Sequence, residues 1–195
     1  MNFSEPIILT THQVRLEPLT LSHFDDLAEI AVQQIDLLKY SPSPFGSIEA
    51  IQQYIDHAIK DRSHQKRYPF AIIHLHNQKC IGSTSYMSFS MSDRRVEIGS
   101  TWMDKSLHGS GLNAHCKYLL LDYAFGVLGM CRVELKTDAR NAQSRRAIEK
   151  IGGIYEGKLR SHTVLSDGHR RDTVYYSILD DEWEASALRA SFTKI

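Results

Sequence analysis

The chain has 195 residues, of which 42% are hydrophobic and 24% charged, and its 23 Lys and Arg residues balance its 23 Asp and Glu residues. This length and composition are typical of one globular domain that buries its core without disulfide bonds, and they exclude a disordered tail or a collagen-like repeat. Because the charges balance, no overall field attracts nucleic acid or an anionic membrane, and any site for an anion must be local.

The sequence shows no pattern of a membrane span, a signal peptide or a metal centre. No apolar run approaches the ~20 residues of a membrane span, and the N-terminus lacks a basic region followed by a long apolar stretch. The cysteines, Cys80, Cys116 and Cys131, are odd in number and show no C-x-x-C spacing, which disfavours a disulfide framework or a Cys-based metal site. We therefore expect one cytoplasmic domain over residues 1–195, with no metal, no membrane contact and no nucleic-acid partner.

The first third of the chain predicts one strand and two helices. Residues 13–17 form the strand, and Ser22 is a suitable N-cap for the first helix. The apolar positions of that helix recur at helical spacing: Phe24, Leu27, Ala28, Ala31 and Ile35. Residues 41–47, rich in Ser and Pro, end it, and Ser47 caps the second helix. The apolar face of the second helix consists of Ile48, Ile51, Ile55 and Ile59.

Three strands follow, over residues 70–76, 80–89 and 96–103. Short turns at 77–79 and 90–95 connect them. Connections of this length join antiparallel neighbours, so this half of the sheet should be antiparallel.

The rest of the chain alternates helices and strands. A long amphipathic helix over 112–127 has one apolar side, made of Leu112, Cys116, Leu119, Leu120, Tyr123 and Val127. The remaining predicted elements are a strand at 131–137, a helix at 143–151 closed by Gly152 and Gly153, strands at 154–165 and 171–178 around the turn Asp167-Gly168, and a short helix from 182 to the C-terminus. A helical crossover joins parallel strands, so the strands at 96–103 and 131–137 should be parallel.

Residues 100–117, STWMDKSLHGSGLNAHCK, are the most informative segment. A strand runs through Gly109-Ser110-Gly111 directly into the long helix, and glycines allow the backbone to approach a ligand closely. The free N–H groups and the dipole of a helix start favour an anion, which makes this turn a candidate cradle for a pyrophosphate. A plain tight turn is the alternative. No P-loop pattern is present, and the absence of a third glycine disfavours a dinucleotide-binding turn.

The order of the elements and motifs resembles the GNAT acetyltransferases over about residues 10–185, and within them the branch of ribosomal-protein N-terminal acetyltransferases. The motifs that carry the resemblance are Glu97-Ile98-Gly99 with Trp102, Gly109-Ser110-Gly111, residues 141–146 (NAQSRR), Glu156-Gly157 and the tail at 172–183. The resemblance implies an α/β fold with a mixed, twisted sheet, antiparallel in its first half and covered by helices on both faces. It also implies acetyl-CoA as cosubstrate, a primary amine as acceptor and a homodimer.

The resemblance assigns roles to particular residues. Those that match CoA-contacting positions are Trp102, Met103, Gly109, Ser110, Gly111, Leu112, Asn113, Asn141 and Arg146. The backbone near 101–103 matches the donor to the thioester oxygen. The chain departs from the family at Ser106, where the family often has Gln or Arg. It also has Ala147, Ile148 and Glu149 where many members place a tyrosine acid.

Three residues are candidates for the proton transfers that an amine and a thioester require. Glu97 is the first candidate base, with a surface carboxylate paired with Arg94 or Arg95 as the alternative. His162 is the second candidate base, although a lone histidine is more often structural. Ser144 matches a serine near the leaving sulfur, with an ordinary exposed helical serine as the alternative.

The resulting hypothesis is acetyl transfer from acetyl-CoA to a primary amine by direct attack in a ternary complex, since no cysteine stands where an acyl-enzyme would need it. The resemblance to the ribosomal branch implies a protein N-terminal amine as acceptor. The alternatives are a small amine such as an antibiotic or polyamine, and a catalytically silent acyl-CoA-binding module. The acceptor pocket is expected between the loops at 39–46 and 160–169.

Overall fold

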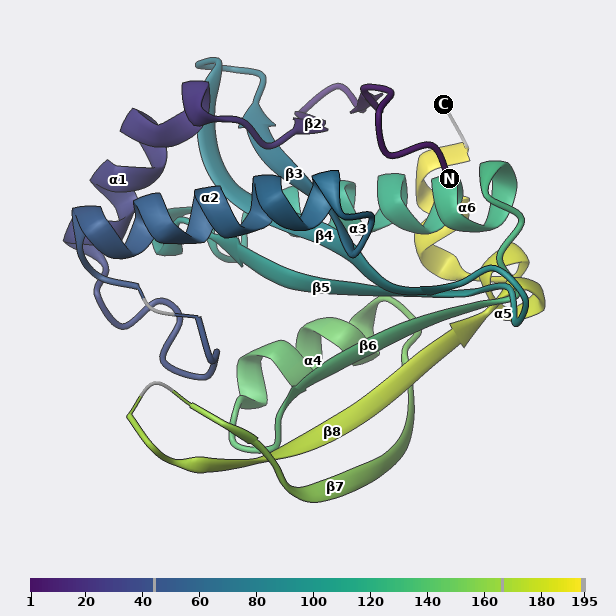
Figure 1. Ribbon diagram of the computed structural model, residues 1–195. Helices are drawn as coiled ribbons and strands as arrows, with labels where there is room; N and C mark the ends of the chain where they lie inside the picture. Colours follow the sequence, from purple (N-terminus) through teal and green to yellow (C-terminus); the bar gives the residue numbers. More distant parts are fainter. Residues whose placement is uncertain (44, 166, 194–195) are drawn as a thin grey trace.

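The computed structural model describes residues 1–43, 45–165 and 167–193. A single eight-stranded sheet has the order β1-β2-β3-β4-β5-β6-β8-β7. Its strands are β1 (Leu9–Thr10), β2 (Val14–Pro18), β3 (Arg67–His74), β4 (Lys79–Ser90), β5 (Arg95–Met103), β6 (Arg132–Asp138), β7 (Ile154–Val164) and β8 (Arg170–Leu179). The helices are α1 (Phe24–Gln33), α2 (Ile48–Ser63), α3 (Leu112–Asp122), α4 (Ala142–Lys150), α5 (Asp180–Glu184) and α6 (Ala187–Thr193), as Figure 1 shows.

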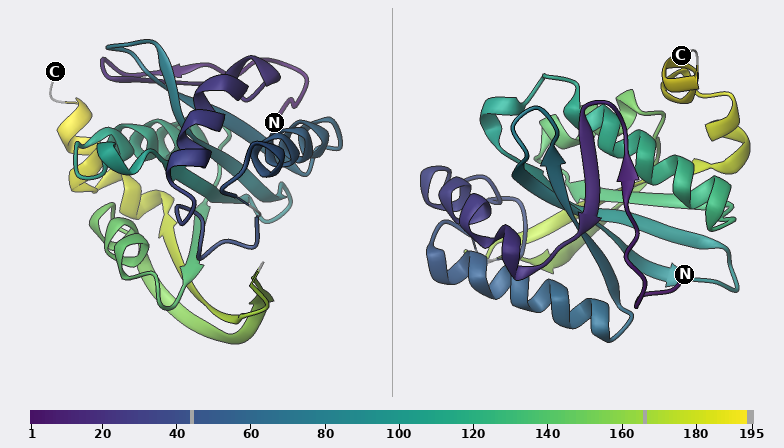
Figure 2. Two further views of the ribbon diagram at one scale, coloured as in Figure 1. Left: turned by 90° about the vertical axis from the view of Figure 1, so that its left-hand side faces the viewer. Right: turned by 90° about the horizontal axis from the view of Figure 1, so that it is seen from above.

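Two layers of helices cover the sheet, α1 and α2 on one face and α3 and α4 on the other; the right-hand view of Figure 2 shows α2 and α3 on opposite sides of the strands. On the α1 face, Leu27 and Ile51 pack against Ala71 and Trp102. The larger core lies on the α3 face and includes apolar side chains from both the long helix and the strands. The mixed sheet with helices on both faces confirms the predicted fold class.

The strand directions follow the prediction. All neighbouring strands are antiparallel except β5 and β6, which are parallel and pair Arg95 with Arg132, Val96 with Val133 and Glu97 with Glu134. This pairing ends at Glu97, so residues 98–103 of β5 are not paired with β6. The two parallel strands therefore begin together and separate toward the C-terminal end of β5.

A bulge in β5 lies where the strands separate. Ser83 pairs with Trp102 and Ser85 pairs with Gly99, so the single residue Thr84 stands opposite both Ser100 and Thr101. Ser100 has a φ of +46°, which is the left-handed region that a bulge imposes on one residue.

The bulge exchanges the two faces of the strand. Ile98 and Met103 both belong to the core on the α3 face, although residues five positions apart lie on opposite faces of a regular strand. Trp102 is thereby turned toward the α1 face. The alternation of polar and apolar residues does not reveal this exchange.

Several local predictions are confirmed. The backbone N–H of Ala50 donates to Ser47 Oγ at 3.1 Å, so Ser47 caps α2. Gly152 closes α4 with a φ of +99°, and β7 and β8 form the predicted antiparallel hairpin. The predicted loops at 41–47 and 160–169 each contain one residue outside the described ranges, as does the end of the predicted C-terminal helix at 194–195.

Four local predictions are wrong. Ser22 is not the cap of the first helix, because a 3-10 turn over Leu21–His23 precedes it with Thr20 as N-cap. The helix ends at Gln33, so Ile35 lies beyond it and is exposed. Ile48 is exposed because it is the first residue of α2. Val127 is exposed because α3 continues as a wider π-helical turn over Tyr123–Val127, which changes the helical spacing.

Gly82, opposite the bulged segment, allows a close approach between β4 and β5. A Cβ atom at this position would lie 2.2 Å from the carbonyl oxygen of Trp102. We predict that Gly82→Ala lowers the free energy of unfolding by about 3 kcal/mol, because the strands must shift apart. Urea unfolding measures this. Gly126→Ala is the matched control, since no described atom lies within 4 Å of a Cβ there; equal midpoints for the two variants would contradict the prediction.

Candidate active site

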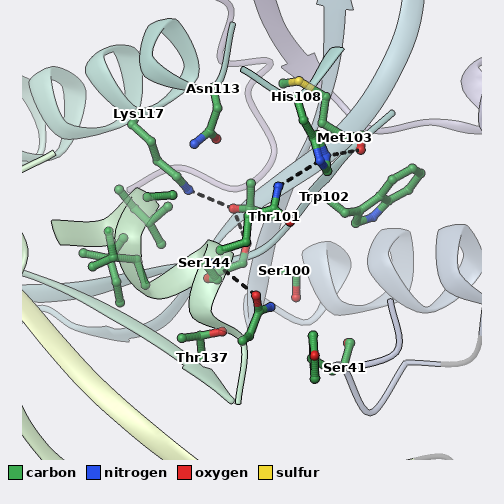
Figure 3. A pocket seen from close by; sticks show the side chains of 18 of the residues that line it. Ser41, Ser100, Thr101, Trp102, Met103, His108, Asn113, Lys117, Thr137 and Ser144 are labelled. Carbon is green, nitrogen blue, oxygen red and sulfur yellow. Dashed lines mark hydrogen bonds between the residues drawn. The ribbon is translucent and has the colours of Figure 1, made fainter. Parts of the chain in front are cut away.

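A cavity of about 600 Å³ opens beside the bulged part of β5. Its walls come from the segment after α1, from β5, from the turn before α3, from α3 itself, and from β6, α4 and β8. Figure 3 shows side chains of several of these elements around the same space. Of the predicted site residues, those that line the cavity are Trp102, Met103, Gly109, Gly111, Asn113, Asn141, Ser144 and Arg146. Ser110, Leu112, Glu97 and His162 lie outside the described lining.

The glycine turn leaves backbone donors free at one end of the cavity. Gly109 and Gly111 have φ values of +83° and +93°, which only glycine adopts without strain. The N–H groups of Gly109, Gly111 and Asn113 have no hydrogen-bond partner among the residues that the structure describes. Free N–H groups at the start of a helix favour an anionic ligand.

Ser110 and Leu112 support the turn rather than face the cavity. The Ser110 hydroxyl donates to the Leu107 carbonyl oxygen at 2.6 Å, and its oxygen accepts weakly from the Leu112 N–H at 3.4 Å. The Leu112 side chain is buried in the core on the α3 face. The sequence predicts that both residues contact the cofactor, but their side chains contact other parts of the protein and shape the turn instead.

His108 is a residue of the cavity wall that the sequence analysis missed. Its Nδ1 lies 2.9 Å from Gln143 Nε2 on α4, and its Nε2 lies 3.1 Å from the Met103 carbonyl oxygen. When the Gln143 amide donates to Nδ1, Nε2–H donates to Met103. His108 therefore connects the end of β5 to α4 across the glycine turn, a contact between segments that are distant in sequence.

The start of α4 faces the same cavity. Asn141 is its N-cap, and its Oδ1 accepts from the Ser144 N–H at 3.0 Å. The Ser144 hydroxyl, half-buried in the wall, makes no hydrogen bond to any residue in the described ranges. Burial raises the pKa of the neighbouring Asp138, but its hydrogen bonds with Arg140 outweigh burial and hold the pKa below its usual value. Asp138 thus stays ionised and fixes the loop that precedes α4.

Glu97 lies behind the cavity wall, on the α1 face of the sheet. Its carboxylate is buried, and Oε2 accepts from Lys136 Nζ at 2.9 Å and from Ser88 Oγ at 3.0 Å. Oε1 has no partner among the described residues, and a Cβ on Gly99 would lie 2.8 Å from it. Gly99 lines the cavity. Glu97 is therefore not the surface carboxylate paired with Arg94 or Arg95 considered as the alternative, and its free oxygen is adjacent to the cavity at Gly99.

His162 lies outside the cavity. It is exposed on β7, and its Nδ1 is 3.1 Å from the Thr173 hydroxyl. The same hydroxyl accepts from Arg171 Nε at 3.0 Å, and Arg171 Nη1 donates to the Tyr40 carbonyl oxygen at 3.1 Å. Arg171 is buried in the cavity wall, and burial lowers its pKa from the ordinary value. Arg171 thus attaches the segment after α1 to β8.

The charged side chains of the cavity wall are positive. The described residues that line it include five cationic side chains and no Asp, Glu or Cys; the cations are Lys117, Lys136, Arg146, Lys150 and Arg171. No group of three or more His, Cys, Asp or Glu side chains in the described ranges is arranged to hold a metal ion. The wall therefore suits a ligand that carries negative charge.

Trp102 contributes a buried hydrogen-bond donor to the cavity wall. Its indole Nε1 is inaccessible to solvent and has no partner among the described residues, while the ring packs edge-on against Phe45 and Tyr54. Leaving such a donor unsatisfied costs about 1–3 kcal/mol. Trp102 lines the cavity, and these aromatic contacts fix the orientation of its indole ring there.

The sequence profile described as "Acetyltransferase (GNAT) domain" matches residues 13–154, which is more than half of the chain. The chain belongs to the GNAT acetyltransferase family. A crystal structure from T. thermophilus, described as a putative acetyltransferase, superposes with a TM-score of 0.85 and 31% identity over 97% of each chain. The GNAT fold is therefore shared over nearly the whole described chain.

Two curated GNAT relatives carry more specific names. The Bacillus subtilis (strain 168) protein YdaF, described as a putative ribosomal N-acetyltransferase, is 34% identical over 110 residues, which are 56% of this chain and 59% of that protein. The chain thus matches less than two thirds of that relative's length. Spermidine N(1)-acetyltransferase of Escherichia coli (strain K12) is 22% identical over 90% of this chain and 91% of its own. Among the described residues, no helix combines the length and apolar character needed to cross a membrane.

We predict that Gly111→Val weakens acetyl-CoA binding by about 10- to 100-fold, because a β-branched residue cannot hold the positive φ that aims the free amides. Isothermal calorimetry measures the affinity. Gly129→Val is a matched control: Gly129 also has a positive φ, +65°, with no described atom within 4 Å of a Cβ, but it lies beyond the other end of α3. Equal losses of affinity in the two variants would show that backbone strain, and not the position of the amides, is responsible.

Proposed function

We propose that this GNAT protein transfers an acetyl group from acetyl-CoA to a primary amine, with both substrates bound at once. The observation that supports the proposal most is that one cavity joins the free amides of the glycine turn to the bulged segment of β5. The first feature suits a pyrophosphate and the second suits a thioester whose oxygen needs backbone donors.

The residues present fit acetyl-CoA. The N–H groups of Gly109, Gly111 and Asn113 would hold the pyrophosphate, and no described atom lies within 4 Å of a Cβ at either glycine, so a ligand has room there. Arg146 and Lys150 stand on the same wall and would neutralise further phosphate charge. Asn141 would contact the pantetheine arm, and the backbone around 101–103 would face the thioester oxygen. Acetyl-CoA supplies the activated acyl group; the protein supplies position and charge.

Glu97 is the proposed base. Lys136 and Ser88 hold Oε2, which fixes the carboxylate while Oε1 remains available beside Gly99. A base positioned in this way takes a proton from the attacking amine directly or through one water molecule. Ser144, on the α4 wall and with its hydroxyl unpaired within the described chain, would assist near the sulfur.

Direct attack is favoured because the described lining of the cavity offers no thiol for an acyl-enzyme. None of Cys80, Cys116 or Cys131 lines it. Burial also raises the pKa of the Cys80 and Cys116 thiols to about 12, which keeps them protonated and unreactive.

The proposed acceptor is a protein N-terminal amine. An α-amine has an unperturbed pKa of about 7.7–8.0, so a larger fraction of it is neutral near pH 7 than of an alkylamine with a pKa near 10.4. A cavity whose described wall holds five cations and no carboxylate suits an amine that enters neutral, and it disfavours a polycation such as spermidine. The name of the relative YdaF supports the same choice.

We predict that Glu97→Gln lowers turnover about 100-fold and leaves the affinity for acetyl-CoA unchanged, because the substitution removes the base and not a CoA contact. A thiol-release assay with a panel of peptide and small-molecule amines measures turnover. Glu134→Gln is the matched control, since Glu134 pairs with Glu97 across the β5–β6 register but lies outside the described cavity lining. Full activity of Glu97→Gln together with inactivity of His162→Ala would assign the base to His162, and no thiol release by the wild-type protein would favour a silent acyl-CoA-binding module.

We also propose that the protein forms a homodimer through the edge strand β7. This strand is the last in the sheet order, so its outer edge has no neighbouring strand within the described chain. Four of its apolar side chains are exposed, namely Ile154, Tyr155, Leu159 and Val164. A long edge strand with exposed apolar residues favours association, and a second copy of the chain is the occupant we propose.

We predict a particle of twice the 22.3 kDa mass of one chain in light scattering at working concentration. Leu159→Asp should shift the protein toward the monomer, because it places an unpaired charge in the proposed interface. Lys79→Asp, an exposed change on β4, is the control. A wild-type protein that is monomeric throughout the concentration series would refute the dimer.

A further inference from the structure

Lys117 is a buried cation in the wall of the cavity. It lies in the middle of α3, only 6% of its surface is exposed, and its Nζ donates to the Thr101 hydroxyl at 2.8 Å. The Thr101 hydroxyl is in turn 2.7 Å from that of Thr84 on β4. Figure 3 shows the Lys117 side chain extended from α3 toward Thr101 at the bulge.

Within the described ranges, no carboxylate compensates this charge. Lys117 forms no ion pair with any residue there, and no Asp or Glu is among the described residues that line the cavity it faces. An ammonium group has three donors, and Thr101 is the acceptor of one of them. A buried charge without a partner is costly, so a retained one points to a ligand that supplies the partner.

The position of Lys117 on α3 would place its side chain near the sulfur of a bound acetyl-CoA. It stands six residues after Gly111, which corresponds to roughly 9 Å along the helix from the free amides. Its partner Thr101 belongs to the bulge, beside the backbone that would face the thioester. A ligand that extends from the amides to the bulge therefore brings its reacting end to Lys117.

We propose that Lys117 is a catalytic residue that contacts the thioester sulfur and protonates it as it leaves. This inference rests on the proposed function. The nitrogen–carbon bond to the acceptor amine forms while the carbon–sulfur bond breaks, and the bonding electron pair stays on sulfur. One proton passes from Lys117 Nζ to that sulfur, and the amine loses one proton to Glu97. Exchange with water then restores both groups.

The acid strength of Lys117 is suitable for this step. Burial lowers its pKa from 10.5 to about 8. This value is close to the unperturbed thiol pKa of about 8.5. Proton transfer is efficient when the pKa values of donor and acceptor are similar and lie near the working pH. Besides Cys116 on its own helix, the titratable side chains that face the same cavity are Tyr40, Tyr54, His108, Lys136, Arg146, Lys150 and Arg171. Thr101, which accepts from Lys117, and Thr84, which contacts Thr101, do not titrate.

The experiment compares wild type with Lys117→Met, which keeps the length of the side chain and removes the proton. With acetyl-CoA we expect turnover to fall about 100-fold, with an unchanged Kd and with loss of the decline in kcat above pH 8. With the acetyl thioester of an aromatic thiol, whose thiolate leaves without protonation, we expect the variant to retain most of the wild-type rate. Lys60→Met, an exposed change on α2, should leave both rates intact.

An equal loss with the two donors, or a weaker Kd with unchanged kcat, would overturn the proposal and make Lys117 a structural or binding residue. A second measurement needs no acceptor: the ultraviolet thiolate absorbance of bound CoA. Its titration should move to lower pH in wild type relative to Lys117→Met, because the ammonium favours the thiolate. No difference would also overturn the proposal.

If Lys117→Met does not fold, Lys117→Arg is the alternative variant. Arg keeps the positive charge at this position, but it cannot donate its proton near neutral pH. It should restore the absorbance shift without restoring turnover, and full turnover in this variant would contradict a proton transfer from Lys117. A wild-type protein that binds CoA with this shift but releases no thiol would disprove the proposed function and leave the contact to sulfur intact.

Discussion

The bulge at Ser100 and Thr101 is the constraint on which the rest of the site depends. One extra residue in β5 rotates the end of the strand, so that Thr101 and Met103 face α3 while Trp102 faces α1 and α2. In an unbulged strand Thr101 would point away from Lys117, and the large indole of Trp102 would enter the core on the α3 face. Because β5 stops pairing with β6 at Glu97, the bulged backbone is also free of that second neighbour and can face a ligand.

The same bulge separates the proposed base, Glu97, from the proposed acid, Lys117. Glu97 precedes it and lies on the α1 face, whereas Thr101 follows it and holds Lys117 on the α3 face. Both strand residues have odd numbers and would share a face in a regular strand. Glu97 forms its ion pair with Lys136 through Oε2 and, within the described chain, keeps Oε1 unpaired beside Gly99, whereas Lys117 donates to Thr101. The two groups therefore do not neutralise each other.

The charge of the cavity explains how a chain with no net charge can serve an anionic cosubstrate. Cations from α3, α4, β6 and β8 converge on one space, and no Asp or Glu is among the described residues that line it. The wall is held together by contacts distant in sequence: His108 connects β5 to α4, and Arg171 connects β8 to the segment after α1. These contacts set the shape of the space in which an acceptor would meet the thioester.

The sequence by itself determined the fold class, the parallel β5–β6 pair and the glycine turn, because each depends on local chemistry or on the length of a connection. Short turns force antiparallel strands, a helical crossover forces parallel ones, and two glycines before a helix leave amides free. The sequence did not reveal the bulge, the role of His108, the pairing of Glu97 with Lys136 or the isolation of Lys117. Each of these depends on contacts between side chains of different strands and helices. Such contacts are inferred from the alternation of side chains between the two faces of a strand, and the bulge interrupts this alternation. Lys117 illustrates the limit: in the sequence it is one lysine on an amphipathic helix, and only the packed sheet shows that no carboxylate of the described chain reaches it.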